Sequence, residues 1–474
     1  MSSMGQSYKC PNCKKLAREL AAVRAENAAL RQENAEIKRR LAALEDEIRR
    51  CKRQAAPFSR DRTKAERKKP GRRKGQGTFD HRRPPHEGVT ETVTVPLDRC
   101  PVCGGPLSDK RTHEHIQTDL PRPEPTHTRF VNESGYCAHC RRRFRSRHPQ
   151  QGSTASGAAG VSVGPNARAT AADLHHRLGV PYAKIADHFK TAAGLDVTPS
   201  ALCQSNERLA AKLNSVYKEL VAALRRACAV HADETGWRIG TLSAWLWVFT
   251  SRHVTVYVID ESRGHEVVVE ILGREFKGTL VGDCFLAYDH KDFADWIKQK
   301  CLAHLLKDLR KIEAEKTRGA VCFPRAVTQV LHDALALRDE KPTLTPHRFA
   351  RRLGRIERRL DALIDESRIF SDPDNARFAK RLRKQRPHLF TFLTLDGVDA
   401  TNNAAERQLR PAVIVRKTGG CNKTAAGALT HAVNASVLQT ARQNGINPVA
   451  YVTHVLASPV QPRPPLPVFA RASP

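Results

Sequence analysis

Three acidic residues stand in sequence settings that could support chemistry on phosphodiesters. They are Asp233 in "VHADETGW", Asp283 in "TLVGDCFLAYD" and Glu406 in "TNNAAERQLRP". Carboxylate oxygens are ligands that Mg²⁺ prefers, and a pair of such ions stabilises both the attacking and the leaving oxygen of an in-line displacement. Brought together by folding, the acids could hold two Mg²⁺ ions, or two Mn²⁺ ions. The alternative for each acid is a solvated surface charge or a helix cap, as for most acids.

The surrounding residues predict the elements that would position these acids. The run "SAWLWVFTSRHVTVYVID" after Asp233 is rich in aromatic and β-branched residues and predicts a hairpin broken at "SRH". A further strand, "GTLVGD", would end at Asp283, and Glu406 would project from the first turns of a helix. An unpaired acid at the end of an apolar strand is costly without a ligand, so both aspartates favour a metal site, whereas the pattern leaves Glu406 open.

Four blocks of the sequence carry a family resemblance. The segments "HADETGW", "GDCFLAYD", "CLAH" and "TNNAAERQLRPAVIVRKTGG" resemble, in the same order, those of the insertion sequence 66 family of DDE transposases. The resemblance implies an α/β multidomain protein with an RNase H-like catalytic core, and it implies that Asp233, Asp283 and Glu406 are the catalytic acids. It also implies Mg²⁺-dependent cleavage at the ends of an insertion sequence, transfer of the cut strand to target DNA, and accessory transposition proteins.

The composition agrees with DNA as the partner. Lys+Arg number 80 against 49 Asp+Glu, a net charge of +31 that attracts phosphate whatever the base sequence. No stretch approaches the roughly 20 apolar residues of a membrane span, and the first residues lack the apolar core of a signal peptide. We therefore expect a protein of the bacterial cytoplasm, associated with the nucleoid, whose 13 cysteines are metal ligands or buried thiols.

The first segment predicts a coiled coil. Its apolar seam advances by alternating steps of four and three through Leu16, Leu20, Val23, Asn27, Leu30, Asn34, Ile37, Leu41, Leu44 and Ile48. Asparagines at two equivalent seam positions fix the register of a parallel dimer, so we expect a homo-oligomer formed through this helix. The alternative is a single amphipathic helix that packs on the body of the protein.

Two Cys-x-x-Cys pairs predict one structural Zn²⁺ ion. The four thiols are Cys100, Cys103, Cys137 and Cys140. Two such pairs can surround Zn²⁺ tetrahedrally, and the strand-like segments "VTETVTVPL" and "HEHIQTDLP" would suit a ribbon of hairpins around it. His113, His115 and His139 are spare ligands should one thiol be unused. The alternative is four free thiols.

Basic residues in three places are predicted to contact DNA, with phosphate contacts expected before base contacts. They are Arg72, Arg73 and Lys74 in a linker, Arg141, Arg142 and Arg143 beside the second cysteine pair, and Arg407, Arg410, Arg416 and Lys417 near the catalytic glutamate. The last two lie in "AVIVRK", which is strand-like. The linker could instead be a soluble spacer.

Helical patterns fill much of the remaining chain. Three short helices between residues 166 and 227 resemble a helix-turn-helix unit, although such a unit is more often a packed bundle. Long helical stretches between Asp283 and Glu406 predict a helical insertion in the core, whose arginine-rich faces could clamp DNA or be solvated surfaces. Cys301 and His304 would share one helical face, where packing beside the active site is the simpler interpretation.

These patterns together divide the chain into predicted segments. The segments are a coiled coil (1–56), a basic linker (57–95), a zinc-binding module (96–150), a helix-turn-helix-like domain (151–222), the first part of the core (223–312), a helical insertion (313–395), the second part of the core (396–456) and a Pro-rich tail (457–474). The alternative functions are a catalytically inactive dimeric zinc-containing DNA-binding regulator and an RNase H-like nuclease without strand transfer.

Overall fold

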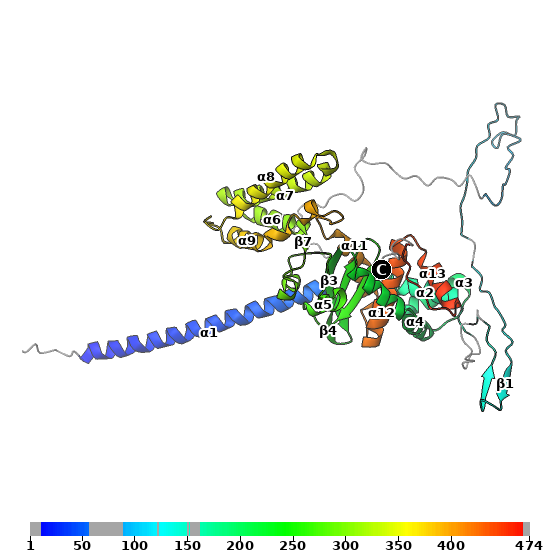
Figure 1. Ribbon diagram of the computed structural model, residues 1–474, viewed down its shortest axis with the longest axis horizontal. Helices are drawn as coiled ribbons and strands as arrows, with labels where there is room; N and C mark the ends of the chain where they lie inside the picture. The colour runs from blue at the N-terminus through cyan, green and yellow to red at the C-terminus, as the bar shows by residue number, and fades with distance from the viewer. Residues whose placement is uncertain (1–10, 56–88, 121–122, 149–150, 152–161, 468–474) are drawn as a thin grey trace, which may run out of the picture.

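A mixed five-stranded sheet lies at the centre of the molecule (Figure 1). The computed structural model describes residues 11–55, 89–120, 123–148, 151 and 162–467. The predicted linker lies mostly outside these residues, as does the end of the predicted tail. In the described part of the chain, no helix is both long and apolar enough to cross a membrane.

The strand order β5-β4-β3-β6-β7 is consistent with an RNase H-like core. The strands are β3 (Ala229–Ile239), β4 (Leu242–Thr250), β5 (Thr255–Asp260), β6 (Thr279–Gly282) and β7 (Lys298–Lys300). β3, β4 and β5 form an antiparallel meander, and β6 and β7 run parallel to β3. The predicted hairpin, its break after Thr250 and the predicted strand before Asp283 are all confirmed.

Helices cover both faces of this sheet because the strands alternate apolar residues on both sides. The helices on one face are α4 (Pro199–Arg225), α5 (Glu266–Leu272), α12 (Ala425–Gln443) and α13 (Pro448–Ala457). There Trp247 and Phe249 of β4 are buried together with Leu213 of α4 and Val437 of α12. On the other face, Trp237 of β3 packs with the helix α11 (Asn403–Gly419).

The predicted helices ahead of the sheet are present. They are α2 (Pro165–His176), α3 (Tyr182–Ala193) and α4. Gly194 ends α3 with φ of 66°, and the Thr198 side chain caps α4 by accepting a hydrogen bond from the backbone of Ala201. α2 packs against α12 and α13, so these helices sit on the core. Their reading of DNA stays a prediction.

The strand predicted at "AVIVRK" is wrong, because these residues belong to α11. Its β-branched run after Pro411 is typical of a strand, but the apolar residues Ala405, Leu409 and Ala412 recur at helical spacing and face the sheet. Burial of this stripe outweighs both the strand propensity and the hydrogen bond that proline removes. Arg416 and Lys417 therefore lie in the last turn of a helix.

The residues between β7 and α11 form helices with their own apolar core. The helices are α6 (Leu302–Glu315), α7 (Cys322–Glu340), α8 (Pro346–Ile364), α9 (Pro373–Gln385) and α10 (Thr391–Thr394). The 3-10 helices in the described part of the chain are η1 (Leu286–Asp289), η2 (Lys291–Phe293), η3 (Arg318–Val321), η4 (Lys341–Thr343) and η5 (Arg386–His388). Leu331 and Leu360, on α7 and α8, are fully buried in this second core. We call residues 302–394 the helical insertion.

The N-terminal part contains one long helix and one short hairpin. The helix α1 (Pro11–Ala55) covers the predicted coiled coil, and its seam residues Leu20, Leu30 and Leu41 are about half exposed. The hairpin pairs β1 (Ser134–Cys137) with β2 (Arg142–Arg145). The strands predicted at 89–97 and 113–120 are wrong: Val93 and Val95 are exposed there, and a strand needs a partner and a buried face.

Candidate active site

Asp233 lies on the face of the sheet that α11 covers. Side chains alternate along a strand, so Asp233 shares its face with Trp237, which packs against α11. β6 pairs with β3 only as far as His231, so Asp233 stands just beyond the end of the parallel pairing. Asp233 is therefore close to the residues that follow β6.

Asp283 is the residue that follows β6. Its Oδ1 accepts a hydrogen bond of 2.8 Å from the backbone of Phe285, which fixes the turn after the strand. Burial raises the pKa of Asp233 well above its usual value, and the neighbouring carboxylates of Glu234 and Asp283 raise it further. The two predicted aspartates are therefore brought together in a site with an excess of negative charge.

Glu406 joins this site through His304. The Oε1 atom of Glu406 lies 3.8 Å from Nε2 of His304. Potential ligand atoms of Cys301, His304 and Glu406 lie within 4.8 Å of one another, whereas Asp233, Asp283 and Glu406 do not form such a compact group among the described residues. The thiol of Cys301, and then the carboxylates of Asp283 and Glu406, raise the pKa of His304 to about 9. His304 is therefore a cation beside Glu406.

Asn402 is buried and connects the elements that carry the site. Its Nδ2 donates to the carbonyl of Ala232 at 2.8 Å, and its Oδ1 lies 3.3 Å from Nδ1 of His231. Its backbone N–H donates to Sγ of Cys301 at 3.1 Å. The side chain shapes the start of α11 but does not cap the helix. These contacts tie β3, the start of α6 and the start of α11 to one another.

A buried ion pair supports the loop of Asp283. Nζ of Lys300 lies 2.7 Å from Oδ1 of Asp289 and donates to the carbonyl of Asp283 at 3.2 Å. Burial opposes ionisation of Asp289, but the Lys300 ammonium, with smaller contributions from Gln385 and Lys384, lowers the pKa of this carboxyl. No pattern in the sequence indicates this pair, since lysines in a short strand usually face solvent.

Glu234 supports the same loop from the other side. Its Oε1 accepts from Nη2 of Arg263 at 2.8 Å, and its Oε2 accepts from the hydroxyl of Tyr288 at 2.9 Å. The guanidinium of Arg263 lies between the rings of Trp245 and Phe285, 4.3 Å and 4.1 Å from their centroids. Burial raises the pKa of Glu234. No local pattern in the sequence indicates these residues, because their contacts join segments far apart in the chain.

The predicted DNA contacts have different surroundings. Arg407 and Arg410 are exposed on α11 near Glu406, whereas the guanidinium of Arg416 donates to Oγ1 of Thr235 at 3.2 Å and to the carbonyl of Gly236. Arg416 therefore ties α11 to β3. Lys417 is exposed beside it, and Arg141, Arg142 and Arg143 are exposed at the β1–β2 hairpin. Arg72, Arg73 and Lys74 lie outside the described residues.

The two cysteine pairs share a local turn but are not brought together. The residue after each pair has positive φ, 72° at Gly104 and 51° at Arg141. In the second turn the backbone of Cys140 donates to Sγ of Cys137 at 3.4 Å. Among the described residues, the thiols of Cys100, Cys103, Cys137 and Cys140 do not form a group of ligands within 4.8 Å. The zinc site stays a prediction.

A second group of potential ligands does not suit one metal ion. Ligand atoms of His265, His290 and Asp292 lie within 4.8 Å of one another, but the two imidazoles stack with centroids 3.4 Å apart and planes at 19°. The lone pair of an imidazole nitrogen lies in its ring plane, so two nearly parallel stacked rings cannot direct their lone pairs at one ion. We therefore assign this group no metal.

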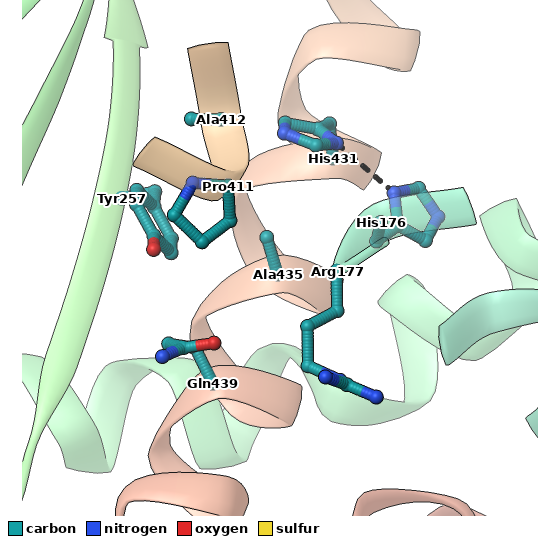
Figure 2. A pocket seen from close by; sticks show the side chains of 8 residues that line it. All are labelled: His176, Arg177, Tyr257, Pro411, Ala412, His431, Ala435 and Gln439. Carbon is teal, nitrogen blue, oxygen red and sulfur yellow. Dashed lines mark hydrogen bonds between the residues drawn. The ribbon is translucent and has the colours of Figure 1, made fainter. Parts of the chain in front are cut away.

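The cavity in Figure 2 is structural. It lies between α2, α11, α12 and β5, and its volume of about 10 Å³ suits about one water molecule. At one side, Nδ1 of His176 lies 3.1 Å from Nδ1 of His431. Burial lowers the pKa of His431 to about 3, and that of His176 well below its usual value, so both rings are neutral. The cavity excludes a substrate of any size.

The part of the chain that carries the site matches a known protein family. Residues 160–430 match the family described as "Transposase IS66 family", which is more than half of the chain. The chain belongs to the IS66 transposase family. The match includes the sheet, the helical insertion and all three predicted acids, whereas α1 and the cysteine pairs lie before it.

Two curated relatives are also similar to the chain. The uncharacterized protein y4hP of Sinorhizobium fredii (strain NBRC 101917 / NGR234) is 25% identical over 507 residues, covering 94% of this chain and 84% of the relative. The uncharacterized protein y4qI of the same strain is 23% identical over 291 residues, covering 56% of this chain. The alignment spans 53% of y4qI, about half its length.

Proposed function

We propose that this member of the IS66 transposase family binds the ends of an insertion sequence, cuts DNA there and transfers the cut strand to target DNA. Asp233, Asp283 and Glu406 are the proposed catalytic acids. The observation that carries the proposal is that Asp233, in β3 just beyond its pairing with β6, and Asp283, directly after β6, are neighbours, and that the helix of Glu406 covers the face of Asp233. A cluster of carboxylates can hold the divalent cations that cleavage of a phosphodiester uses.

The donor set of the site fits divalent metal ions. Burial, and after it the carboxylates of Glu234 and Asp283, raise the pKa of Asp233, and Glu234 already binds Arg263 and Tyr288, so the ionised acids would gain from added positive charge. Mg²⁺ or Mn²⁺ at Asp233, Asp283 and Glu406 would supply Lewis acidity to the reacting oxygens. Carboxylate oxygens are suitable ligands for either ion, and the half-buried position of Asp233 and Asp283 limits competition from water.

The remaining side chains of the site hold and balance the acids. Asn402 and Arg416 fix α11 on β3, which positions Glu406. The Lys300–Asp289 pair fixes the loop of Asp283. His304, Arg407 and Arg410 place positive charge beside Glu406, where it would oppose the charge of a bound phosphate. The proposed reaction uses water and a DNA hydroxyl as nucleophiles, so no covalent protein intermediate is involved.

The variant Asp283→Asn tests the proposal, with Asp295→Asn at an exposed position as the control. We expect Asp283→Asn to lower Mg²⁺-dependent cleavage of DNA carrying the element ends by about 10³-fold or more, because it removes a charged ligand. Binding of the same DNA and the activity of the control should be unchanged. Cleavage retained by Asp283→Asn would refute the assignment.

The activity of the unsubstituted chain separates this proposal from the regulator. A catalytically inactive DNA-binding regulator would bind the ends with no Mg²⁺-dependent cleavage. A nuclease without strand transfer would cut the ends but give no joined product with target DNA. A gel assay that resolves cut and joined strands distinguishes all three outcomes.

The N-terminal elements are proposed to assemble the protein. The exposed seam of α1 supports a parallel homo-dimer, in which Leu20, Leu30 and Leu41 would be buried. The matching turns of the two cysteine pairs support one structural Zn²⁺ held by Cys100, Cys103, Cys137 and Cys140. Light scattering of a chain with seam leucines replaced by lysine, and zinc analysis of the purified protein, test these two points. Accessory transposition proteins remain proposed partners.

A further inference from the structure

The helix α8 carries a row of arginines with no acidic partner. Arg348, Arg351, Arg355 and Arg358 are all exposed. Their spacing of three, four and three residues places them on one side of a helix, over a length of about 15 Å. Among the described residues, none of these guanidinium groups forms an ion pair or a hydrogen bond. We call these residues the arginine stripe.

The acids near α8 are neutralised by other arginines. Glu357 and Asp361, on α8 itself, both bind Arg386 of η5. Glu340 binds Arg352, and Asp333 binds Arg359. The tertiary structure therefore separates the charges of this helix: acids are paired on the sides that face α7 and η5, and the stripe is left unneutralised.

A merely solvated helix surface does not account for the stripe. Like charges three or four residues apart repel one another, and a cation in the first turn, such as Arg348, also opposes the helix dipole. Solvated helices usually relieve this repulsion with acids at the same spacing. Here the repulsion is retained over the whole row, which favours a surface that receives its counter-charge from a ligand.

A polyanion suits this surface better than a protein partner. Protein interfaces bury an apolar centre, but no large apolar side chain of α8 is among the exposed ones. B-DNA carries one negative charge per about 1.7 Å of axis, so a duplex lying along the stripe presents more phosphates over about 15 Å than the four guanidinium groups need as partners. Figure 1 shows α8 on the side of the helical insertion away from β3 and β4, where a duplex can approach it.

We propose that the arginine stripe of α8 binds the phosphate backbone of double-stranded DNA. The inference rests on the proposed function, because it takes DNA as the substrate, and adds a second contact surface outside the catalytic site. The stripe is on a different part of the molecule from Asp233 and Glu406, so it holds DNA away from the scissile phosphate. The contacts are to phosphates and are therefore independent of base sequence.

The test compares two sets of arginines that change the net charge equally. In the first variant Arg348, Arg351, Arg355 and Arg358 are all replaced by glutamine. In the control the same replacement is made at four exposed arginines that are already paired with acids: Arg325, Arg338, Arg359 and Arg377. Binding of the full-length protein to a fluorescent duplex of arbitrary sequence is measured by anisotropy over a range of KCl concentrations.

The stripe variant should bind more weakly and show a shallower dependence of log K on log [KCl], by about 0.9 for each phosphate that the variant no longer neutralises. The control should keep the slope of the unsubstituted protein. Replacement of the stripe by lysines should restore most of the slope, because lysine retains the charge. Thermal unfolding checks that each variant is folded.

An unchanged slope in a folded stripe variant would overturn the proposal, including the case in which the stripe binds an acidic protein instead. Failure of the proposed function would look different. In that case the unsubstituted protein would show no Mg²⁺-dependent cleavage, whatever the stripe variant does to the salt dependence of binding.

Discussion

The sheet around Asp233 and the helical insertion treat their charges in opposite ways. At the sheet, ionised groups are buried: the side chains of Lys300 and Asp289 are 2% and 7% exposed. In the insertion, pairs such as Arg325–Glu313 lie at the surface, with 64% and 33% of the side chains exposed. Buried charges hold one geometry, whereas the exposed arginine stripe of the same insertion, which has no acidic partner among the described residues, remains available to a ligand.

This difference follows from what each region has to do. Chemistry at a phosphodiester needs carboxylates held in place in a site of low dielectric, and the protein bears the desolvation cost by pairing every supporting charge. Attraction of DNA needs cations that keep contact with solvent until the polymer arrives. The same residue types therefore build a fixed site in one region and an open surface in the other.

The largest effect that tests this comparison is on stability. Asp289→Asn leaves the buried ammonium of Lys300 without its closest carboxylate, and we expect a loss of about 3–5 kcal/mol in the free energy of unfolding. Glu313→Gln, which breaks the exposed pair with Arg325, should cost about 0–1 kcal/mol. Chemical denaturation measures both.

The pH dependence of this effect has a defined sign. The pKa of Asp289 is lowered in the folded protein, so the pair contributes fully above the ordinary pKa of an aspartate and its contribution is lost as the pH falls through the lowered value. The difference between Asp289→Asn and the unsubstituted protein should therefore close in acid. Equal losses for Asp289→Asn and Glu313→Gln at neutral pH would contradict the comparison.

A smaller effect is expected at Asn402, which connects β3 to α11. Asn402→Ala removes the contacts of Asn402 with the carbonyl of Ala232 and with Nδ1 of His231, at a cost of about 1–3 kcal/mol. Because the start of α11 also positions Glu406, we expect the rate of DNA cleavage to fall by more than the loss of folded protein alone would cause. Asn403→Ala, at the exposed neighbour, is the matched control. Similar results for the two asparagines would show that Asn402 does not position the helix.

The strands and the two aspartates could be predicted because their signals are local. Apolar runs identify β4, β5 and β6, and Asp283 directly after β6 stands out from the sequence itself, whereas Asp233, predicted at a strand end, lies inside β3. The helix α11 was not predictable in the same way. Its residues after Pro411 have strand propensity, and only packing against β3 and β4 makes a helix the more stable form.

The supporting contacts could not be predicted because they join distant segments. Arg263 reaches Glu234 across 29 residues, and Asn402 reaches Ala232 across 170. The spacing of the arginine stripe is visible in the sequence, but its lack of partners is not. That depends on Arg386 reaching back to Glu357 and Asp361, which only the folded chain shows.

The smallest effect concerns Asp233 in the absence of metal ions. Burial and the nearby acids raise the pKa of this carboxyl, so its ionisation costs stability as the pH rises from the ordinary aspartate value through the raised one. In EDTA at neutral pH, Asp233→Asn should therefore be more stable than the unsubstituted protein, on the order of 1 kcal/mol. In acid the two should converge.

Thermal unfolding with and without MgCl₂ measures this effect. Mg²⁺ should raise the melting temperature of the unsubstituted protein and leave that of Asp233→Asn nearly unchanged, because the variant lacks a charged ligand. Asp295→Asn, at an exposed position, should respond to Mg²⁺ as the unsubstituted protein does. If Asp233→Asn were the less stable protein in EDTA, the site would not hold unbalanced negative charge. The proposed difference between the charges buried at the sheet and those exposed in the insertion would then be wrong.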